Sequence, residues 1–253
     1  MKPSFPHNVH LQLSGLDATK IQHFFRVDSL NVHVGLPVMD ALVQRQESFK
    51  HLKSATIAFG NESTFDFSLT LGFLAQVTSF DLDCMWDPSE DGVEQPRMHF
   101  WHRWTFNCQT LQVFSGHDLP PTYLRKILSV APWLEKATMY NFRDIPVDLT
   151  IPDPTPTFIR HTNLKELWLA ATCLISFLHQ MLPTLDLTGL QSLHLELNDS
   201  NSEVLLPVLG QTQGSVRRLC LRRPLDLSGH QRTLYSLCLH LEELTPQEPH
   251  NLD

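Results

Sequence analysis

Apolar residues recur along the chain in the six-residue pattern apolar-x-x-apolar-x-apolar, clearest at residues 164–169, 190–195 and 216–221. Its final apolar-x-apolar part predicts a short strand with one buried face, because successive strand side chains point to opposite sides. Recurrence at a nearly fixed period predicts a repeat protein. The copies begin at residues 27, 52, 77, 108, 134, 164, 190, 216 and 241. The strands are therefore expected near 30–32, 55–57, 80–82, 111–113, 137–139, 167–169, 193–195 and 219–221.

Between these strands the apolar residues follow the helical period instead. Residues 124–131 and 174–182 carry apolar side chains at helical spacing, and each stretch is followed by a proline. Residues 36–49 and 204–209 are weaker helical candidates. One strand–helix unit cannot bury its own apolar faces, so we expect the units to stack with their strands in parallel.

Periods in the twenties with an L-x-x-L-x-L core resemble the leucine-rich repeat. The resemblance implies an α/β solenoid like the ribonuclease-inhibitor horseshoe, with a parallel concave sheet and helices on the convex side. We expect eight to nine repeats of 25–31 residues in a single domain over residues 1–253. Residues 1–26 would form its N-terminal edge, 27–245 the repeats and 246–253 a tail.

Residues 126–135, Lys-Ile-Leu-Ser-Val-Ala-Pro-Trp-Leu-Glu, are similar to the repeats of fungal F-box proteins, in which a helix ends at a proline before the next strand. The resemblance covers residues 27 to about 245. It implies target recognition in a Skp-cullin-F-box ubiquitin ligase. Residues 36–42 resemble only the opening of an F-box and are assigned to an outer helix. Association with a Skp-cullin ligase is therefore expected only if an F-box lies outside this chain.

The composition narrows the function classes further. A formal net charge of −8 argues against nucleic-acid binding, which depends on clustered Lys and Arg. Five cysteines without a C-x-x-C pair indicate neither a disulfide framework nor a zinc site, which favours a cytoplasmic or nuclear protein. No apolar run is long enough to span a membrane, and the start lacks the apolar stretch of a signal peptide. We expect a monomer.

Catalytic and cofactor motifs are absent from the sequence. The 14 histidines accompany no nucleophile elbow, H-E-x-x-H, phosphate loop or G-x-G-x-x-G motif. Asp81 and Asp83 precede further acidic residues, but a carboxylate run without a partner motif is typical of a solvated loop rather than a metal site. We therefore expect no enzyme activity, no cofactor and no metal.

The residues between the core positions are expected to line the concave face. Phe114, Tyr140 and Trp168 fall at expected outward positions of three consecutive units. Exposed aromatic residues near arginine are typical of binding hot spots. The predicted protein-binding residues are Phe114, Tyr140, Trp168, His194, Arg218 and Arg222. In the alternative interpretation, loops inserted at 83–107 and 141–163 cover some of these rings and make them core.

The leading functional interpretation is a non-catalytic module that recognises a protein target, as the F-box resemblance implies for ubiquitin ligation. A second is an interaction scaffold unrelated to ubiquitination. A third is a repeat-type regulator of an enzyme such as a small GTPase, although a repeat fold alone does not imply that function. The sequence does not identify the target protein.

Overall fold

The computed structural model describes residues 10–14, 28–34, 49–59, 74–84, 108–119, 121–141, 158–171, 184–197, 215–221 and 243–246. They fall into two compact units, one up to Asp118 and one from Leu119 onward. In both units parallel strands follow one another after turns of about 26 residues, so the architecture is a parallel β-solenoid. The expectation of a single domain stays a prediction.

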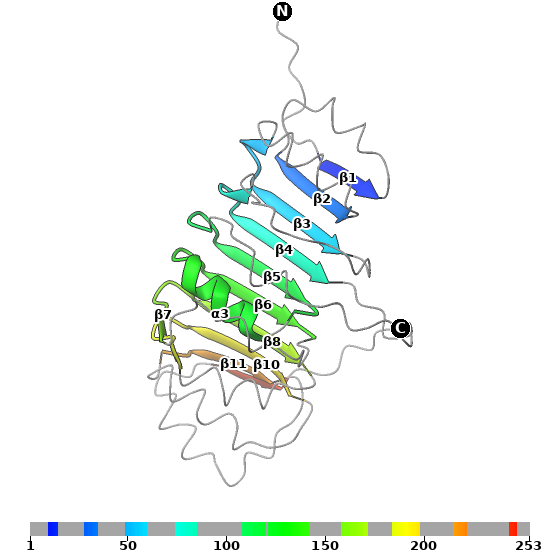
Figure 1. The fold of residues 1–253 in the computed structure, drawn as a ribbon. Coiled ribbons are helices and arrows are strands. Elements are labelled where there is room, and N and C mark those ends of the chain that lie inside the picture. The colour runs from blue at the N-terminus through cyan, green and yellow to red at the C-terminus, as the bar shows by residue number, and fades with distance from the viewer. Residues whose placement is uncertain are drawn as a thin grey trace, which may run out of the picture. The chain divides into compact units, whose positions relative to one another are not determined.

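The first unit contains five parallel strands, which pair in chain order (Figure 1). The register repeats faithfully in its early part: Ser29 lies beside Ser54, and Ser54 lies beside Ser79. The strands are β1 (His10–Ser14), β2 (Ser29–Val34), β3 (Ser54–Phe59), β4 (Ser79–Cys84) and β5 (Val113–His117).

The second unit also carries five parallel strands paired in chain order. They are β6 (Lys136–Tyr140), β8 (Glu166–Ala171), β10 (Ser192–Leu197), β11 (Arg218–Leu221) and β12 (Glu243–Pro246). A second sheet joins the two-residue strands β7 (Ile159–Arg160) and β9 (Leu185–Asp186). The helix α3 (Pro121–Val130) precedes β6.

The core is built by alternate strand residues, as the hexapeptide pattern predicts. In β10, Leu193 and Leu195 are buried whereas His194 is partly exposed. Burying one leucine side chain contributes roughly 1.5–3 kcal/mol, so each added turn extends a continuous apolar interior. The equivalent buried residues of the other strands are Leu30, Val32, Ala55, Ile57, Phe80, Leu82, Phe114, Ala137, Met139, Leu167, Leu169, Leu219 and Leu221.

The turns before the strands repeat as faithfully as the strands do. In five turns the first apolar residue of the hexapeptide donates its N–H to the carbonyl three residues earlier, as Leu190 does to Leu187 at 2.9 Å. Consecutive turns are also joined, because one carbonyl accepts two N–H groups from the next turn. Lys165, for example, accepts from Gln191 and Ser192, each at 2.9 Å. These bonds satisfy backbone groups that would otherwise be buried unpaired.

One strand register was predicted wrongly. The sequence places Leu111 and Val113 inside a strand, but β5 begins at Val113 and sets Phe114 beside Phe80. Leu111 instead donates its N–H to Cys108 in the preceding turn, as Val77 does to Leu74. The repeat therefore begins at Leu111 rather than Cys108. Apolar residues at 108, 111, 113 and 114 allow both registers, and the long interval before them removes the regular spacing that would choose between them.

The other seven expected strands are confirmed at β2, β3, β4, β6, β8, β10 and β11. The helix expected at 124–131 is confirmed as α3, which buries Tyr123, Leu124, Ile127 and Leu128 and ends just before Ala131 and Pro132. The helical candidates at 36–49, 174–182 and 204–209 lie largely or wholly outside the described residues. The described part contains little helix, so a helical convex side is not shown.

Candidate binding surface

In the second unit, alternate strand residues point away from the core and form what we call the exposed strand face. The register places Trp168 between Thr138 and His194, with Cys220 beyond His194. A neighbouring row brings together Lys136, Glu166, Ser192 and Arg218. The exposed strand face is thus made by Lys136, Tyr140, Glu166, Trp168, His194, Glu196, Arg218 and Cys220, with the buried polar residues Thr138 and Ser192 on the same side of the strands.

Three aromatic side chains from successive strands form a continuous ring stack on this face. The rings of Tyr140 and Trp168 have centroids 6.0 Å apart and are tilted by 54°. The imidazole of His194 lies nearly parallel to the Trp168 indole, with centroids 4.8 Å apart and 14° between the planes. All three residues are half-buried, so each ring also keeps a surface in contact with solvent. Both geometries are among those that aromatic pairs favour.

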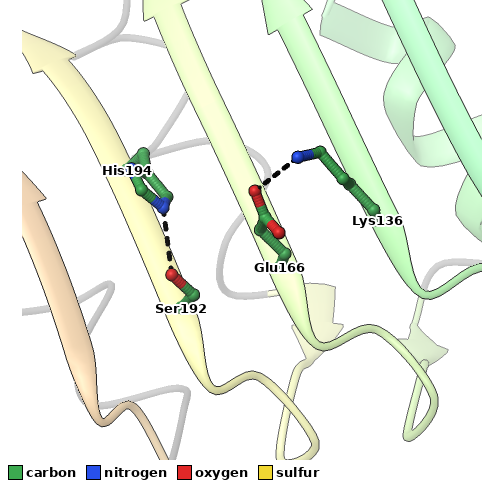
Figure 2. A network of polar contacts seen from close by, with 4 residues as sticks. All are labelled: Lys136, Glu166, Ser192 and His194. Carbon is green, nitrogen blue, oxygen red and sulfur yellow. Dashed lines mark hydrogen bonds and ion pairs between the residues drawn. The ribbon is translucent and has the colours of Figure 1, made fainter.

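Two polar contacts join residues of the exposed strand face, and one of them involves the imidazole of the ring stack (Figure 2). Lys136 Nζ donates to Glu166 Oε1 at 2.7 Å, so these two opposite charges largely neutralise each other. Ser192 Oγ and His194 Nε2 are hydrogen-bonded at 3.0 Å. Because Ser192 is only 7% exposed, this bond ties the imidazole to a buried residue. The exposed strand face is therefore preorganised.

The basic end of this face lies on β11. Arg218 is exposed and lies beside Ser192 in the register, next to the strand that carries His194. Arg217, immediately before it, is exposed as well. The predicted binding residue Arg222 lies outside the described residues. Positive charge therefore accumulates at one end of the ring stack, in a chain whose formal net charge is −8.

The structure brings four of the predicted binding residues, Tyr140, Trp168, His194 and Arg218, to one face. Their role in binding stays a prediction. The outward position expected for Phe114 is wrong. That ring is 0% exposed and packs in the first unit against Phe80, with centroids 6.1 Å apart. Its burial follows from the corrected register of β5, which turns Phe114 toward the core.

The outward face of the first unit is small and polar. Ser54 donates its hydroxyl to Ser29 at 2.9 Å, and Asp81 and Asp83 are half-exposed on β4. His117 Nε2 lies 3.9 Å from Asp81 Oδ1. Among the residues that the structure describes, no group of three His, Cys, Asp or Glu side chains could hold a metal ion. The described residues of this face offer hydrogen-bonding groups but form no ring stack like that of the second unit.

Two exposed aromatic residues were missed by the sequence reasoning. Trp133 is 61% exposed and Phe158 is 57% exposed, and both lie in turns before strands rather than on the exposed strand face. The apolar pattern does not mark them, because neither Trp133 nor Phe158 occupies an apolar position of the hexapeptide. The contacts between Lys136 and Glu166 and between Ser192 and His194 were also not predicted, although the spacing already placed all four residues on one side of the sheet.

Comparison with known proteins identifies no relative: no family model, no curated protein and no solved structure matches the chain. Within the described ranges, no helix is both long and apolar enough to cross a bilayer. The class that the structure defines is the parallel β-solenoid with turns of about 26 residues.

Proposed function

We propose that this chain is a non-catalytic protein-binding module, and that it binds its partner through the exposed strand face of the second unit. The observation that carries this proposal is the ring stack of Tyr140, Trp168 and His194. Tryptophan, tyrosine and arginine are the residues most enriched at binding hot spots, and Arg218 lies one strand beyond the stack.

The preorganisation of the stack favours binding in energetic terms. Ordering a flexible side chain at an interface costs about 0.5–1.5 kcal/mol. The indole of Trp168 is already held between two rings, and the imidazole of His194 is already bonded to Ser192. A partner that covers these rings therefore desolvates apolar surface with little further loss of side-chain freedom.

Within the class of parallel β-solenoids, we assign the chain to the leucine-rich repeats, in which helical return segments cover the convex side. It is supported by the L-x-x-L-x-L core and by register partners 25 or 26 residues apart, such as Glu166 beside Ser192. The F-box resemblance extends the proposal to target recognition for a Skp-cullin ubiquitin ligase in the cytoplasm or nucleus. An interaction scaffold or a regulator of a small GTPase would use the same surface, so the identity of the partner discriminates among them.

Affinity purification followed by mass spectrometry tests the proposal when three baits are compared in parallel. The baits are the parent chain, Trp168→Ala and Trp133→Ala, of which the last removes an equally large exposed ring outside the exposed strand face. Thermal melts first establish that both variants are folded. We expect proteins enriched by the parent to be retained by Trp133→Ala and lost with Trp168→Ala. Equal recovery with Trp168→Ala would reject the proposed surface.

A further inference from the structure

The exposed strand face has a charge asymmetry that restricts the chemistry of its partner. At the β6 side, Lys136 is matched by Glu166 at 2.7 Å. At the β11 side, Arg217 and Arg218 are both exposed, and Arg222 and Arg223 follow within the same short stretch of sequence. Arg222 and Arg223 lie outside the described residues, but Arg217 and Arg218 alone make this end locally complementary to negative charge in a chain of net charge −8.

We infer that the partner presents an extended, acidic segment, with an apolar or aromatic side chain on Trp168 and a carboxylate on Arg218. This inference rests on the proposed function, because it names the partner chemistry of the same surface. Arginine suits a carboxylate because its planar guanidinium can donate two parallel hydrogen bonds to it. The parallel indole and imidazole rings provide a flat platform for the apolar side chain.

The register fixes the spacing between the two anchors. Trp168 and Arg218 lie two strands apart, and Arg218 is offset by two residues along the strand direction. With strands about 4.8 Å apart and about 3.3 Å per residue, their Cα atoms are separated by about 12 Å. An extended segment covers that distance in about three or four residues. The acidic residue should therefore lie three or four positions from the apolar one.

The acidic side chains of the second unit restrict where on the exposed strand face a partner carboxylate can bind. Glu196 lies two residues after His194 on β10, and Glu166 lies two residues before Trp168 on β8, where Lys136 neutralises its charge. Glu196 would repel a carboxylate placed beyond His194 along β10, because like charges disfavour close approach. Glu243 is the register partner of Arg218 on the side away from the ring stack. The favourable position for a partner carboxylate is therefore between Arg218 and His194.

The test starts from random dodecapeptides displayed on phage and selected on the immobilised full-length chain. Selected sequences should combine an aromatic or large apolar residue with Asp or Glu three or four positions away. A synthetic peptide of the best sequence is then titrated with its Glu→Gln counterpart. We expect the Gln peptide to bind the parent about fivefold more weakly, and we expect Arg218→Ala to remove that difference.

Lys165→Ala is the matched control, since it removes a positive charge from an exposed turn position where Lys165 pairs with Glu135 at 3.1 Å. It should keep the preference for Glu over Gln. If peptides depend on Trp168 but show no preference for an acid, the inference is wrong while the proposed function stands. If no peptide is selected, or if no selected peptide loses affinity with Trp168→Ala, the inference and the proposed function are both wrong. Tight binding only after replacing Glu by phosphoserine would also overturn the carboxylate assignment.

Discussion

His161 Nδ1 accepts the backbone N–H of Leu164 at 3.1 Å, the role that a main-chain carbonyl fills in the equivalent turns of five other repeats. The other ring nitrogen, Nε2, lies 2.9 Å from the carbonyl oxygen of Ala131. Both bonds form together only in the neutral ring with its proton on Nε2. The side chain is 3% exposed, and burial lowers the pKa of His161 below 6.5, although the bond to Ala131 partly opposes this shift.

The second unit should therefore lose stability in mild acid. Below pH 6.5 the unfolded chain binds a proton at His161 that the folded chain still excludes. Above that pH the contribution of neutral His161 to the free energy of unfolding is fully present. This contribution is lost as the pH falls from 6.5 through the lowered pKa of the folded state. The slope from this group is at most about 1.4 kcal/mol per pH unit.

Denaturant titrations of the parent and of His161→Leu over this pH range measure the effect. Leucine occupies the equivalent position at Leu74 and Leu187, so the substitution suits the repeat. The other histidines contribute equally to both proteins, and the difference in slope therefore belongs to His161. Parallel pH profiles for the two proteins would show that the buried imidazole does not control acid stability.

Phe114→Ala tests the corrected register of β5. Because the ring is fully buried against Phe80, its loss should lower the free energy of unfolding by about 3–5 kcal/mol. Val113→Ala, one residue earlier and partly exposed, should change it by less than about 1 kcal/mol. Chemical denaturation of both variants distinguishes the registers. A larger loss for Val113→Ala would restore the strand assignment made from the sequence.

The repeat architecture could be predicted because each hexapeptide carries the same information. In β10, leucines alternate with Ser192, His194 and Glu196, and this pattern fixes both the strand and its buried face. Where an insertion interrupts the spacing, as before β5, local pattern alone could not choose between Leu111 and Phe114 as the first buried strand residue. The repeat spacing was thus sufficient to predict the strands where it is regular. Before β5 the spacing is interrupted, and there the prediction was wrong.

A contrast between neighbouring residues tests the inward and outward assignment in β10. Leu193→Asp buries a charge without a partner, which costs several kcal/mol, so the variant should be strongly destabilised or unfolded. His194→Ala should cost about 1 kcal/mol, since it removes only a partly exposed ring and its bond to Ser192. Thermal melts compare the two. Equal losses would mean that the strand faces are assigned incorrectly.

Gly189 lies where a side chain has no room, in the turn before β10. A Cβ atom at this position would overlap the backbone carbonyl of Thr162 in the preceding turn. Gly189→Ala should therefore destabilise the second unit by about 1–3 kcal/mol, because backbone must move to admit the methyl group. Thr188→Ala alters the same turn without adding an atom there and should cost less. Similar denaturation midpoints for both variants would contradict this close approach.

The candidate site was predictable only in part. Alternation places Tyr140, Trp168, His194 and Arg218 on one side of the sheet, and the repeat spacing places them on successive strands. The tilt between the Tyr140 and Trp168 rings depends on their side-chain rotamers. The parallel stacking of His194 on Trp168 depends also on the hydrogen bond between His194 and Ser192. Such contacts arise from three-dimensional packing, so spacing alone could not supply them.

The most direct measurement is the affinity of the parent, Trp168→Ala and Trp133→Ala for a partner recovered by affinity purification, determined by calorimetric titration. Removing a true anchor should cost at least about 2 kcal/mol of binding free energy, or about thirtyfold in Kd. Trp133, exposed in a turn, should contribute less than about 1 kcal/mol. We expect weakened binding for Trp168→Ala alone. Unchanged affinity of Trp168→Ala, with binding lost in Trp133→Ala, would contradict it.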